Sequence, residues 1–439
     1  TMPRARTLQV NWHVGGVGGE KHPVLSVNVH PSQPTLATCG ADKEVKLWRL
    51  DVAGEAVEHI QDLSSHSATV NCVRFSPTGD FLCSGADAGE LIVWRQLETE
   101  EGGAQAGSWK LASLLRGHTG DVMDVAWAPD GRSLLSGSVD GEALLWEVSE
   151  RGVGKLLARL QGHEHYVQGV AWDPAGEFLI TQSGDRTCRV YGPKPGMGKV
   201  ASPKNLMLAH VLSKGPLAHG DAPPPSSTAR PPPSAPAPAS AVDDDQATPQ
   251  PPPAKKLRQC LFHDDTFSSF FRRLAWSPDG ALLAVPAGLH KRDTASAPEN
   301  TTHVFSRHAF ARPLLHFPVS KPVVCARFCP VLFAREELAP VTPPGAAPSP
   351  LSALPHRLVL AAATSDTVFV YETGSGALVC ALGALHLATI TDVAWTPDGL
   401  GLMVASSDGY CSLVSFERGE LGTPLAADQR PPLLQPRLP

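Results

Sequence analysis

The sequence predicts an all-β fold built from seven repeated units, and three observations support this prediction. The chain of 439 residues contains 39 Gly and 42 Pro, a share that helix-rich folds tolerate poorly. An apolar strand that ends in an aromatic residue and a Pro-Gly turn recurs along the chain. Histidine and aspartate also recur at a nearly fixed separation. Hydrophobic residues make up 42% of the chain, which suffices for a sizeable core and excludes a wholly disordered protein.

The turn motif is clearest at residues 73–79, with the sequence VRFSPTG, and at residues 125–131, with the sequence VAWAPDG. The alternation of Val125 and Trp127 is typical of a strand with one buried face. Proline and glycine suit the second and fourth positions of a tight turn between strands. Further copies end at residues 172–176, 276–280 and 395–399, and weaker copies lie at residues 27–31 and 326–330.

A second pattern runs in the same register as the turns. A histidine precedes four of the units, an aspartate follows it after 21 or 22 residues, and an aromatic residue closes three of these units. The residues of this pattern are His66, Asp87 and Trp94; His118, Asp140 and Trp146; His163, Asp185 and Tyr191; and His386 with Asp408. This combination resembles the WD40 repeat, which has about 40–45 residues per unit. The resemblance implies a seven-bladed β-propeller with four-stranded blades around a central channel.

The repeats divide the chain into a propeller over residues 7–417 and three segments without the pattern. We expect the repeats at roughly 15–49, 64–95, 116–147, 161–192, 262–306, 322–372 and 385–417. Residues 7–13 alternate and have no partner strand nearby, so we expect them to supply the fourth strand of the last blade, which ends near Phe416.

Proline-rich composition marks the segments outside the repeat pattern. Residues 193–258 are predicted to be a disordered Pro-rich insertion, because residues 221–253 alone contain 12 Pro and cannot bury a core. Within this insertion, residues 200–255 are predicted to be dispensable for folding. Residues 334–356 are predicted to be a Pro-rich loop, and residues 418–439 a disordered tail. The basic residues 255–258 resemble a nuclear import signal, although a plain surface charge explains them equally well.

The histidine–aspartate pairs invite a catalytic interpretation, since such a pair is half of a hydrolytic triad. A pair that recurs around a ring is better explained as architecture that ties loops together within a blade. The sequence has no Gly-rich phosphate loop and no nucleophile elbow. His263, Asp264 and Asp265 follow one another directly, and three such neighbours do not easily converge on one ion. We therefore predict a protein that is not an enzyme and has no catalytic residues, cofactor or metal.

Charge and cysteine content restrict the partners. The 37 basic residues face 43 acidic ones, and the longest acidic run is only residues 243–245. We therefore expect negligible DNA binding and weak or no histone binding by the chain alone. The nine Cys form no CxxC pair, which is typical of reduced thiols in an intracellular protein, and no apolar run is long enough to cross a membrane.

Several segments outside the repeat consensus carry a more specific resemblance. They are residues 166–170 (YVQGV), 261–288, which begin with LFHDD and end with PAG, 300–307 (NTTHVFSR) and 407–412 (SDGYCS). With these segments the chain resembles the WD40 middle-subunit family of chromatin assembly factor 1, over about residues 8–425. The resemblance implies a nuclear, chromatin-associated subunit of a three-subunit histone chaperone, which deposits histones H3 and H4 onto replicated or repaired DNA.

The same resemblance implies the partners. They are the large subunit of the assembly factor and, within the complex, histones H3 and H4. Family members also dock the anti-silencing histone chaperone through a basic-hydrophobic tail motif, and residues 417–439 contain no such motif. Two alternatives remain, namely the WD40 subunit of the replication-independent histone deposition complex and a substrate-receptor propeller of a ubiquitin ligase.

Residues 261–273 are rich in phenylalanine and arginine, which are either core residues or anchors for a partner. Aromatic side chains and arginine are enriched at interface hot spots. The candidate contact with the large subunit consists of Phe267, Phe270, Phe271, Arg272 and Arg273.

Overall fold

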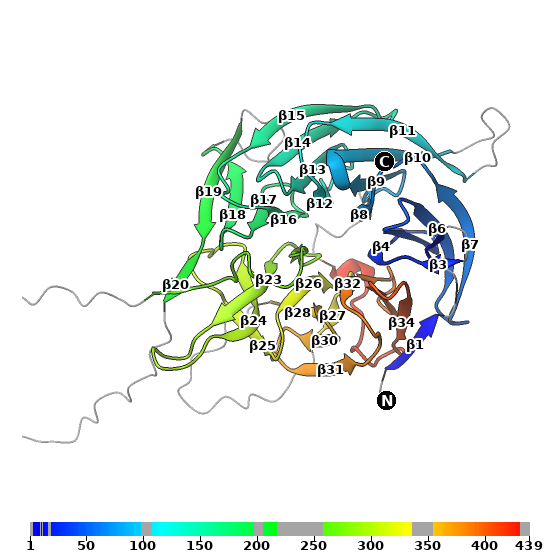
Figure 1. The fold of residues 1–439 in the computed structure, drawn as a ribbon. Coiled ribbons are helices and arrows are strands. Elements are labelled where there is room, and N and C mark those ends of the chain that lie inside the picture. Colours follow the sequence, from blue (N-terminus) through cyan, green and yellow to red (C-terminus); the bar gives the residue numbers. More distant parts are fainter. Residues whose placement is uncertain are drawn as a thin grey trace, which may run out of the picture.

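The computed structural model describes residues 3–8, 10, 12–15, 19–97, 107–196, 205–216, 258–335 and 354–430. Over these residues, seven sheets of four antiparallel strands surround a central channel (Figure 1). The prediction of an all-β, seven-bladed propeller is confirmed. The described residues contain no helix that is long and apolar enough to span a membrane.

The first four blades each use four consecutive strands, counted from the channel outward in the order of the chain. Blade 1 has β4 (Val24–Val29), β5 (Thr35–Gly40), β6 (Val45–Asp51) and β7 (Ala56–Leu63), and blade 2 has β8 (Val70–Phe75), β9 (Phe81–Ala86), β10 (Glu90–Gln96) and β11 (Trp109–Arg116). Blade 3 has β12 (Val122–Trp127), β13 (Ser133–Ser138), β14 (Ala143–Val148) and β15 (Gly154–Leu160), and blade 4 has β16 (Val167–Trp172), β17 (Leu179–Ser183), β18 (Cys188–Pro193) and β19 (Leu206–Leu212).

Blade 5 keeps this order, and blades 6 and 7 depart from it. Blade 5 has β22 (Ala275–Trp276), β23 (Leu282–His290), β24 (Glu299–Ser306) and β25 (Leu315–Val319). Blade 6 has β26 (Val323–Phe328), β29 (Val359–Thr364), β30 (Thr367–Glu372) and β31 (Leu378–Gly383). Blade 7 has β32 (Ile390–Trp395), β33 (Gly401–Ser406), β34 (Cys411–Ser415) and, from the other end of the chain, β1 (Arg4–Leu8).

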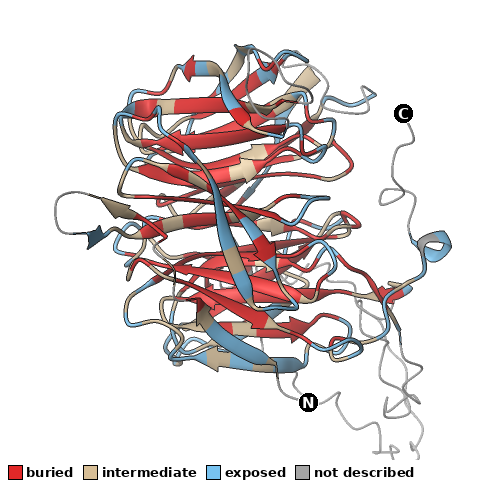
Figure 2. Ribbon diagram, turned by 90° about the vertical axis from the view of Figure 1, so that its right-hand side faces the viewer, coloured by how far each residue is buried: buried red, intermediate tan, exposed pale blue. Residues whose placement is uncertain are grey.

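The core lies in the inner strands. Six inner strands carry the same register shift near their start, for example between Val122 and Asp124 and between Ile390 and Asp392. A bulge of this kind bends a strand and changes where a side chain points. At the third position of two of these strands, Asp124 and Asp392 reach the ion pairs of the channel, while the aromatic residue that ends five of the six strands packs between blades. Figure 2 shows the buried inner strands, with exposed residues on outer strands and loops.

The ring is closed by the N-terminal segment, but the predicted bounds are wrong. Strand β1 pairs with β34 from Arg4 opposite Ser415 to Leu8 opposite Cys411, so the propeller begins at Arg4 rather than at residue 7. Beyond Leu8 the chain leaves the strand. Trp12 is fully buried against Trp48, with ring centroids 4.8 Å apart, and this packing draws the following residues into blade 1.

Parts of the predicted insertion, loop and tail are ordered. Strand β19 lies inside residues 193–258 and pairs with β18 as the fourth strand of blade 4. Strand β20 (Lys214–Pro216) pairs with β21 (Arg258–Cys260), and these two strands join the ends of the insertion. Likewise β27 (Phe333–Ala334) pairs with β28 (His356–Arg357) at the two ends of residues 334–356. Residues 217–257 and 336–353 lie outside the described residues.

The start of the predicted tail packs against blade 6. Leu421 is buried, and the backbone N–H of Leu425 donates to the Leu332 carbonyl at 2.8 Å. The N–H of Ala334 likewise donates to the carbonyl of Thr423 at 2.7 Å. These bonds order the chain after β34, and residues 431–439 lie outside the described part.

Removing residues 1–8 should destabilise the whole propeller, because the edge of β34 becomes unpaired and the buried Leu8 is lost. Loss of one buried leucine side chain alone costs about 2–5 kcal/mol. Thermal unfolding of this deletion, compared with a control that lacks only residues 1–3, measures the effect. Equal midpoints for the two deletions would contradict the closure by β1.

Replacing residues 217–257 with a short Gly/Ser linker should leave the thermal midpoint within a few degrees. This expectation rests on composition alone, because residues 221–253 contain 12 Pro and no large aromatic residue for a core. The same replacement over 200–255 should lower the midpoint strongly, because it removes β19 and with it the edge of blade 4. Calorimetry on the two variants separates these outcomes, and equal midpoints would show that β19 contributes nothing.

Candidate functional site

The predicted histidine–aspartate residues form buried networks within single blades. In blade 3, Nδ1 of His118 lies 2.9 Å from the Asp140 carboxylate and Nε2 lies 2.8 Å from the Ser136 hydroxyl. The indole N–H of Trp146 donates to the same hydroxyl at 2.9 Å. In the simplest arrangement of protons, Nδ1–H of His118 donates to the Asp140 carboxylate, and the Ser136 hydroxyl donates to Nε2 of His118. This chain of bonds ties the loop before β12 to β13 and β14.

Blade 4 repeats the arrangement with other side chains. His163 lies 2.8 Å from Asp185 and 2.7 Å from the hydroxyl of Thr181, and Tyr191 is buried in the place of Trp146. In blade 7, His386 lies 3.1 Å from Asp408. The position 18 residues after this histidine is Val404, so no hydroxyl continues that network.

Blade 1 contains a network that the sequence prediction missed. His13 lies 2.7 Å from Asp42 and 2.9 Å from the Thr38 hydroxyl, which also accepts the indole N–H of Trp48 at 2.9 Å. His13 belongs to this network and not to the closing strand expected over residues 7–13. The spacing of six residues from Asp42 to Trp48 matches that from Asp140 to Trp146, and this signal identifies the network.

The predicted pair of His66 and Asp87 is wrong. His66 contacts Ser84 at 2.6 Å, but its Nδ1 lies 3.6 Å from the carboxylate of Glu90. Asp87 instead accepts a hydrogen bond from Asn71 at 2.8 Å. Asp87 begins a 3-10 turn (Asp87–Gly89), and its spacing to Trp94 is seven residues instead of six. The extra residue moves the carboxylate away from the histidine.

The predicted contact surface at residues 267–273 is also largely wrong, because four of its five side chains are buried. Phe267 and Phe271 pack against the guanidinium groups of Arg272 and Arg273, with 4.8 and 3.9 Å from guanidinium carbon to ring centroid. Both arginine side chains are fully buried. Only Phe270 is exposed, with 66% of its surface accessible.

Arg272 and Arg273 are buried because the segment before β22 enters the channel. The backbone N–H of Arg272 donates to the Gln168 carbonyl at 3.1 Å, and a Cβ at Gly169 would collide with the Arg272 carbonyl. Arg272 also donates to the His263 carbonyl at 2.6 Å. Glycine at position 169 therefore makes room for this segment.

Arg273 donates across the channel to carbonyl groups of three other blades. The acceptors are Leu25 at 2.9 Å, Asn71 at 2.6 Å and Thr391 at 2.7 Å. Its backbone pairs with blade 6, where its N–H donates to the Val324 carbonyl at 3.0 Å. One residue thus joins blades 1, 2, 6 and 7.

Five charged side chains meet in the channel and are called the channel cluster below. They are Arg74, Arg273, Arg327, Asp124 and Asp392. The Asp392 carboxylate lies 2.8, 3.3 and 3.4 Å from Arg74, Arg273 and Arg327. Burial alone would raise the pKa of Asp392, but these three guanidinium groups lower it. Asp392 is therefore a charged structural centre, not a proton donor.

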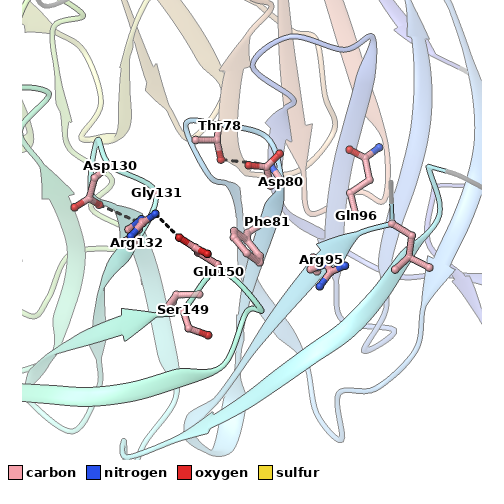
Figure 3. Close-up of a pocket in the computed structure, with 12 residues that line it drawn as sticks. Thr78, Asp80, Phe81, Arg95, Gln96, Asp130, Gly131, Arg132, Ser149 and Glu150 are labelled. Carbon is pink, nitrogen blue, oxygen red and sulfur yellow. Dashed lines mark hydrogen bonds and ion pairs between the residues drawn. The ribbon is translucent and has the colours of Figure 1, made fainter. Parts of the chain in front are cut away.

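A hollow of about 430 Å³ between blades 2 and 3 is a further candidate site (Figure 3). Its charged side chains largely contact one another. Arg132 pairs with Glu150 at 2.7 Å, and its backbone N–H donates to Asp130 at 2.9 Å. The side chains of Arg132 and Glu150 are exposed, so their ion pair contributes little to stability. Within the described ranges, no three His, Cys, Asp or Glu side chains are arranged to hold a metal ion.

Comparison with known proteins explains this architecture. A family model described as the CAF1B/HIR1 beta-propeller domain matches residues 4–205 and 242–421. The chain belongs to this CAF1B/HIR1 family. The match begins at the first residue of β1 and ends at the buried Leu421, so it includes the closure of the ring. It omits residues 206–241, which contain β19.

Relatives within the CAF1B/HIR1 family support the resemblance found in the sequence. The chromatin assembly factor 1 subunit FAS2 homolog of Oryza sativa subsp. japonica is 39% identical over 96% of this chain and 74% of its own length. A chromatin assembly factor 1 subunit of Mus musculus is 34% identical over 99% of this chain and 70% of its own length. Protein HIR1 of Yarrowia lipolytica is 25% identical over 94% of this chain and 38% of its own length.

Asp140→Ala should lower the free energy of unfolding by about 1–3 kcal/mol, because the substitution leaves Nδ1 of the buried His118 without its carboxylate partner. Asp87→Ala is the matched control, since Asp87 does not contact His66, and its effect should be smaller. Urea denaturation of both variants measures the difference. Equal losses would contradict the structural role assigned to the Asp140 pair.

The stability of blade 2 should depend on pH through His66. Burial lowers the pKa of His66 from 6.5 to about 4, and Glu90 only partly opposes this shift. Between pH 7 and 5 the unfolded chain therefore takes up a proton that the folded chain does not, and stability falls as the pH drops. For one such group the loss over this range is about 1–2 kcal/mol.

His66→Gln should flatten the pH dependence of the free energy of unfolding between pH 7 and 5, as measured by urea denaturation at several pH values. His308→Gln is the control, because His308 is exposed. An unchanged slope in His66→Gln would show that the histidine is protonated in the folded protein.

Proposed function

We propose that the chain is a non-enzymatic scaffold subunit of chromatin assembly factor 1 in the nucleus, acting in the deposition of histones H3 and H4 onto replicated or repaired DNA. The observation that carries this proposal is the identity over nearly the whole chain, which is 29–39% to chromatin assembly factor 1 subunits and 25–28% to HIR1 proteins among the relatives compared. The replication-independent deposition complex is therefore the less favoured assignment.

The arrangement of polar groups supports a scaffold rather than an enzyme. The histidines of blades 1, 3 and 4 each contact both a carboxylate and a hydroxyl of their own blade. The arginines of the channel cluster hold the two aspartates in the same way. Side chains that are committed to such bonds stabilise the ring and are not available for chemistry. The surface features that remain are exposed apolar side chains, which suit binding to another protein.

Phe270 is the contact that we propose for the large subunit. Its loop is rigid, because the Gln168 side chain donates to the carbonyls of Ser269 and Phe270 at 3.3 and 3.2 Å. A large aromatic side chain that is exposed on a rigid loop loses little entropy on binding. The half-exposed carboxylate of Asp265 on the same loop favours a partner segment with basic and apolar residues.

The test is a binding measurement between the purified chain and the large subunit, histones H3–H4 and DNA, each alone. We expect stable association with the large subunit, weak or no histone binding and negligible DNA binding near physiological salt. Phe270→Ala should weaken the first interaction about tenfold or more while leaving the fold intact. Val153→Ala, an exposed apolar substitution in the loop before β15, is the matched control and should not change it.

The possible outcomes separate the claims. Absence of binding to the large subunit would overturn the proposed function, and tight binding of DNA or histones by the chain alone would overturn the scaffold role. Full affinity in a folded Phe270→Ala variant would contradict only the proposed contact.

A further inference from the structure

A groove of about 370 Å³ opens at the end of the channel where the inner strands run into the Pro-Gly turns. The walls are mainly apolar and include Phe75, Trp127 and Pro174, and the groove also reaches Arg74, Arg327 and Asp124 of the channel cluster. The volume lies at the lower end of the range for ligand sites, about 300–1,000 Å³. The Phe270 loop precedes the inner segment of blade 5, whereas the groove lies where that segment ends. The groove is therefore separate from the contact proposed above.

The channel cluster carries an unbalanced charge. Among the residues that the structure describes, its three guanidinium groups form ion pairs only with Asp124 and Asp392. Three positive and two negative charges leave a net charge of +1, and none of the five side chains is more than 17% exposed. A buried charge without a counter-charge is costly. A ligand with a single negative charge would offset this cost.

Two unpartnered donors lie in the wall of the same groove. The indole N–H of Trp127 donates to the Arg74 carbonyl at 3.0 Å, and that of Trp395 donates to the Arg327 carbonyl at 3.1 Å. The indole N–H groups of Trp172 and Trp276 are buried and have no acceptor among the described residues. These two side chains line the groove and are only 9% and 7% exposed. A buried donor without an acceptor is rare in native proteins and indicates a missing partner.

We propose that this groove binds the carboxylate of an aspartate or glutamate on an extended segment of a partner protein. A carboxylate brings one negative charge and accepts several hydrogen bonds, which matches the charge of the cluster and the two free indole donors. The proline and aromatic walls suit the apolar parts of a peptide on either side of the acidic residue. The inference goes beyond the proposed function and does not depend on it, because it concerns a different surface and states the chemistry of its ligand.

The test uses the full chain labelled with ¹⁵N at tryptophan and observes the indole N–H signals by NMR. The probes are the blocked peptide Ac-Ala-Glu-Ala-NH₂, its glutamine analogue, acetate and inorganic phosphate. The glutamate peptide should shift the signals of Trp172 and Trp276 in a saturable manner at millimolar concentration. The buried Trp12 donates to the Leu8 carbonyl outside the groove, and its signal should not move.

Variants that remove a single N–H refine the test. Trp172→Phe and Trp276→Phe keep an aromatic ring, and each should weaken binding of the glutamate peptide about tenfold, as expected for a lost hydrogen bond to a charged group. Trp127→Phe is the matched control, since Trp127 lines the same groove but its N–H is already bonded to the Arg74 carbonyl, and it should leave peptide affinity unchanged.

Several results would overturn the inference. They are the absence of a saturable shift with the glutamate peptide, equal affinity for the glutamine analogue, and unchanged affinity in both Trp172→Phe and Trp276→Phe. Acetate or phosphate binding as tightly as the peptide would show that the groove takes a small anion, and would overturn the peptide as its occupant.

Discussion

The burial of Arg273 beside Asp392 in the central channel is the interaction on which the rest of the propeller depends. Arg273 donates to carbonyl groups of blades 1, 2 and 7 and pairs through its backbone with blade 6. Arg74 of blade 2 likewise reaches Asp392 of blade 7 across the channel. A guanidinium group with no exposed surface is tolerated only where acceptors and opposite charge surround it.

The hydrogen-bond networks within the blades stabilise the propeller as well, because they join loops and strands of a single blade. In blades 1 and 3, a histidine, a hydroxyl and a tryptophan are hydrogen-bonded in series, and this series ties a loop to two strands. In blade 2, Glu90 lies near His66 where the other blades have an aspartate. Because these groups are committed to the fold, we place the two contacts proposed for this CAF1B/HIR1 family member at the two ends of the channel. One end presents Phe270, and the other presents a groove with indole and guanidinium donors.

Local sequence signals predicted the repeat well and the exceptions poorly. The Pro-Gly turns and the spacing of histidine and aspartate identified seven blades, because each signal depends on residues within one blade. The network of His13 and Asp42 was missed because a long loop replaces the usual spacing. Strand β19 was missed because its residues, LMLAHVL, follow no repeat pattern and owe their pairing to the open edge of β18.

The sequence by itself determined the fold class, the number of blades, the closure by the N-terminal segment and the resemblance to the chromatin assembly factor 1 subunits. All of these follow from periodicity and motifs that are read along the chain. Only the tertiary structure decided that Arg272 and Arg273 are channel residues, that Phe270 alone of the five candidate contact residues is exposed, and that Trp172 and Trp276 lack acceptors among the described residues. The physical reason is that burial and pairing in the channel depend on residues from several blades, which are brought together only when the ring closes.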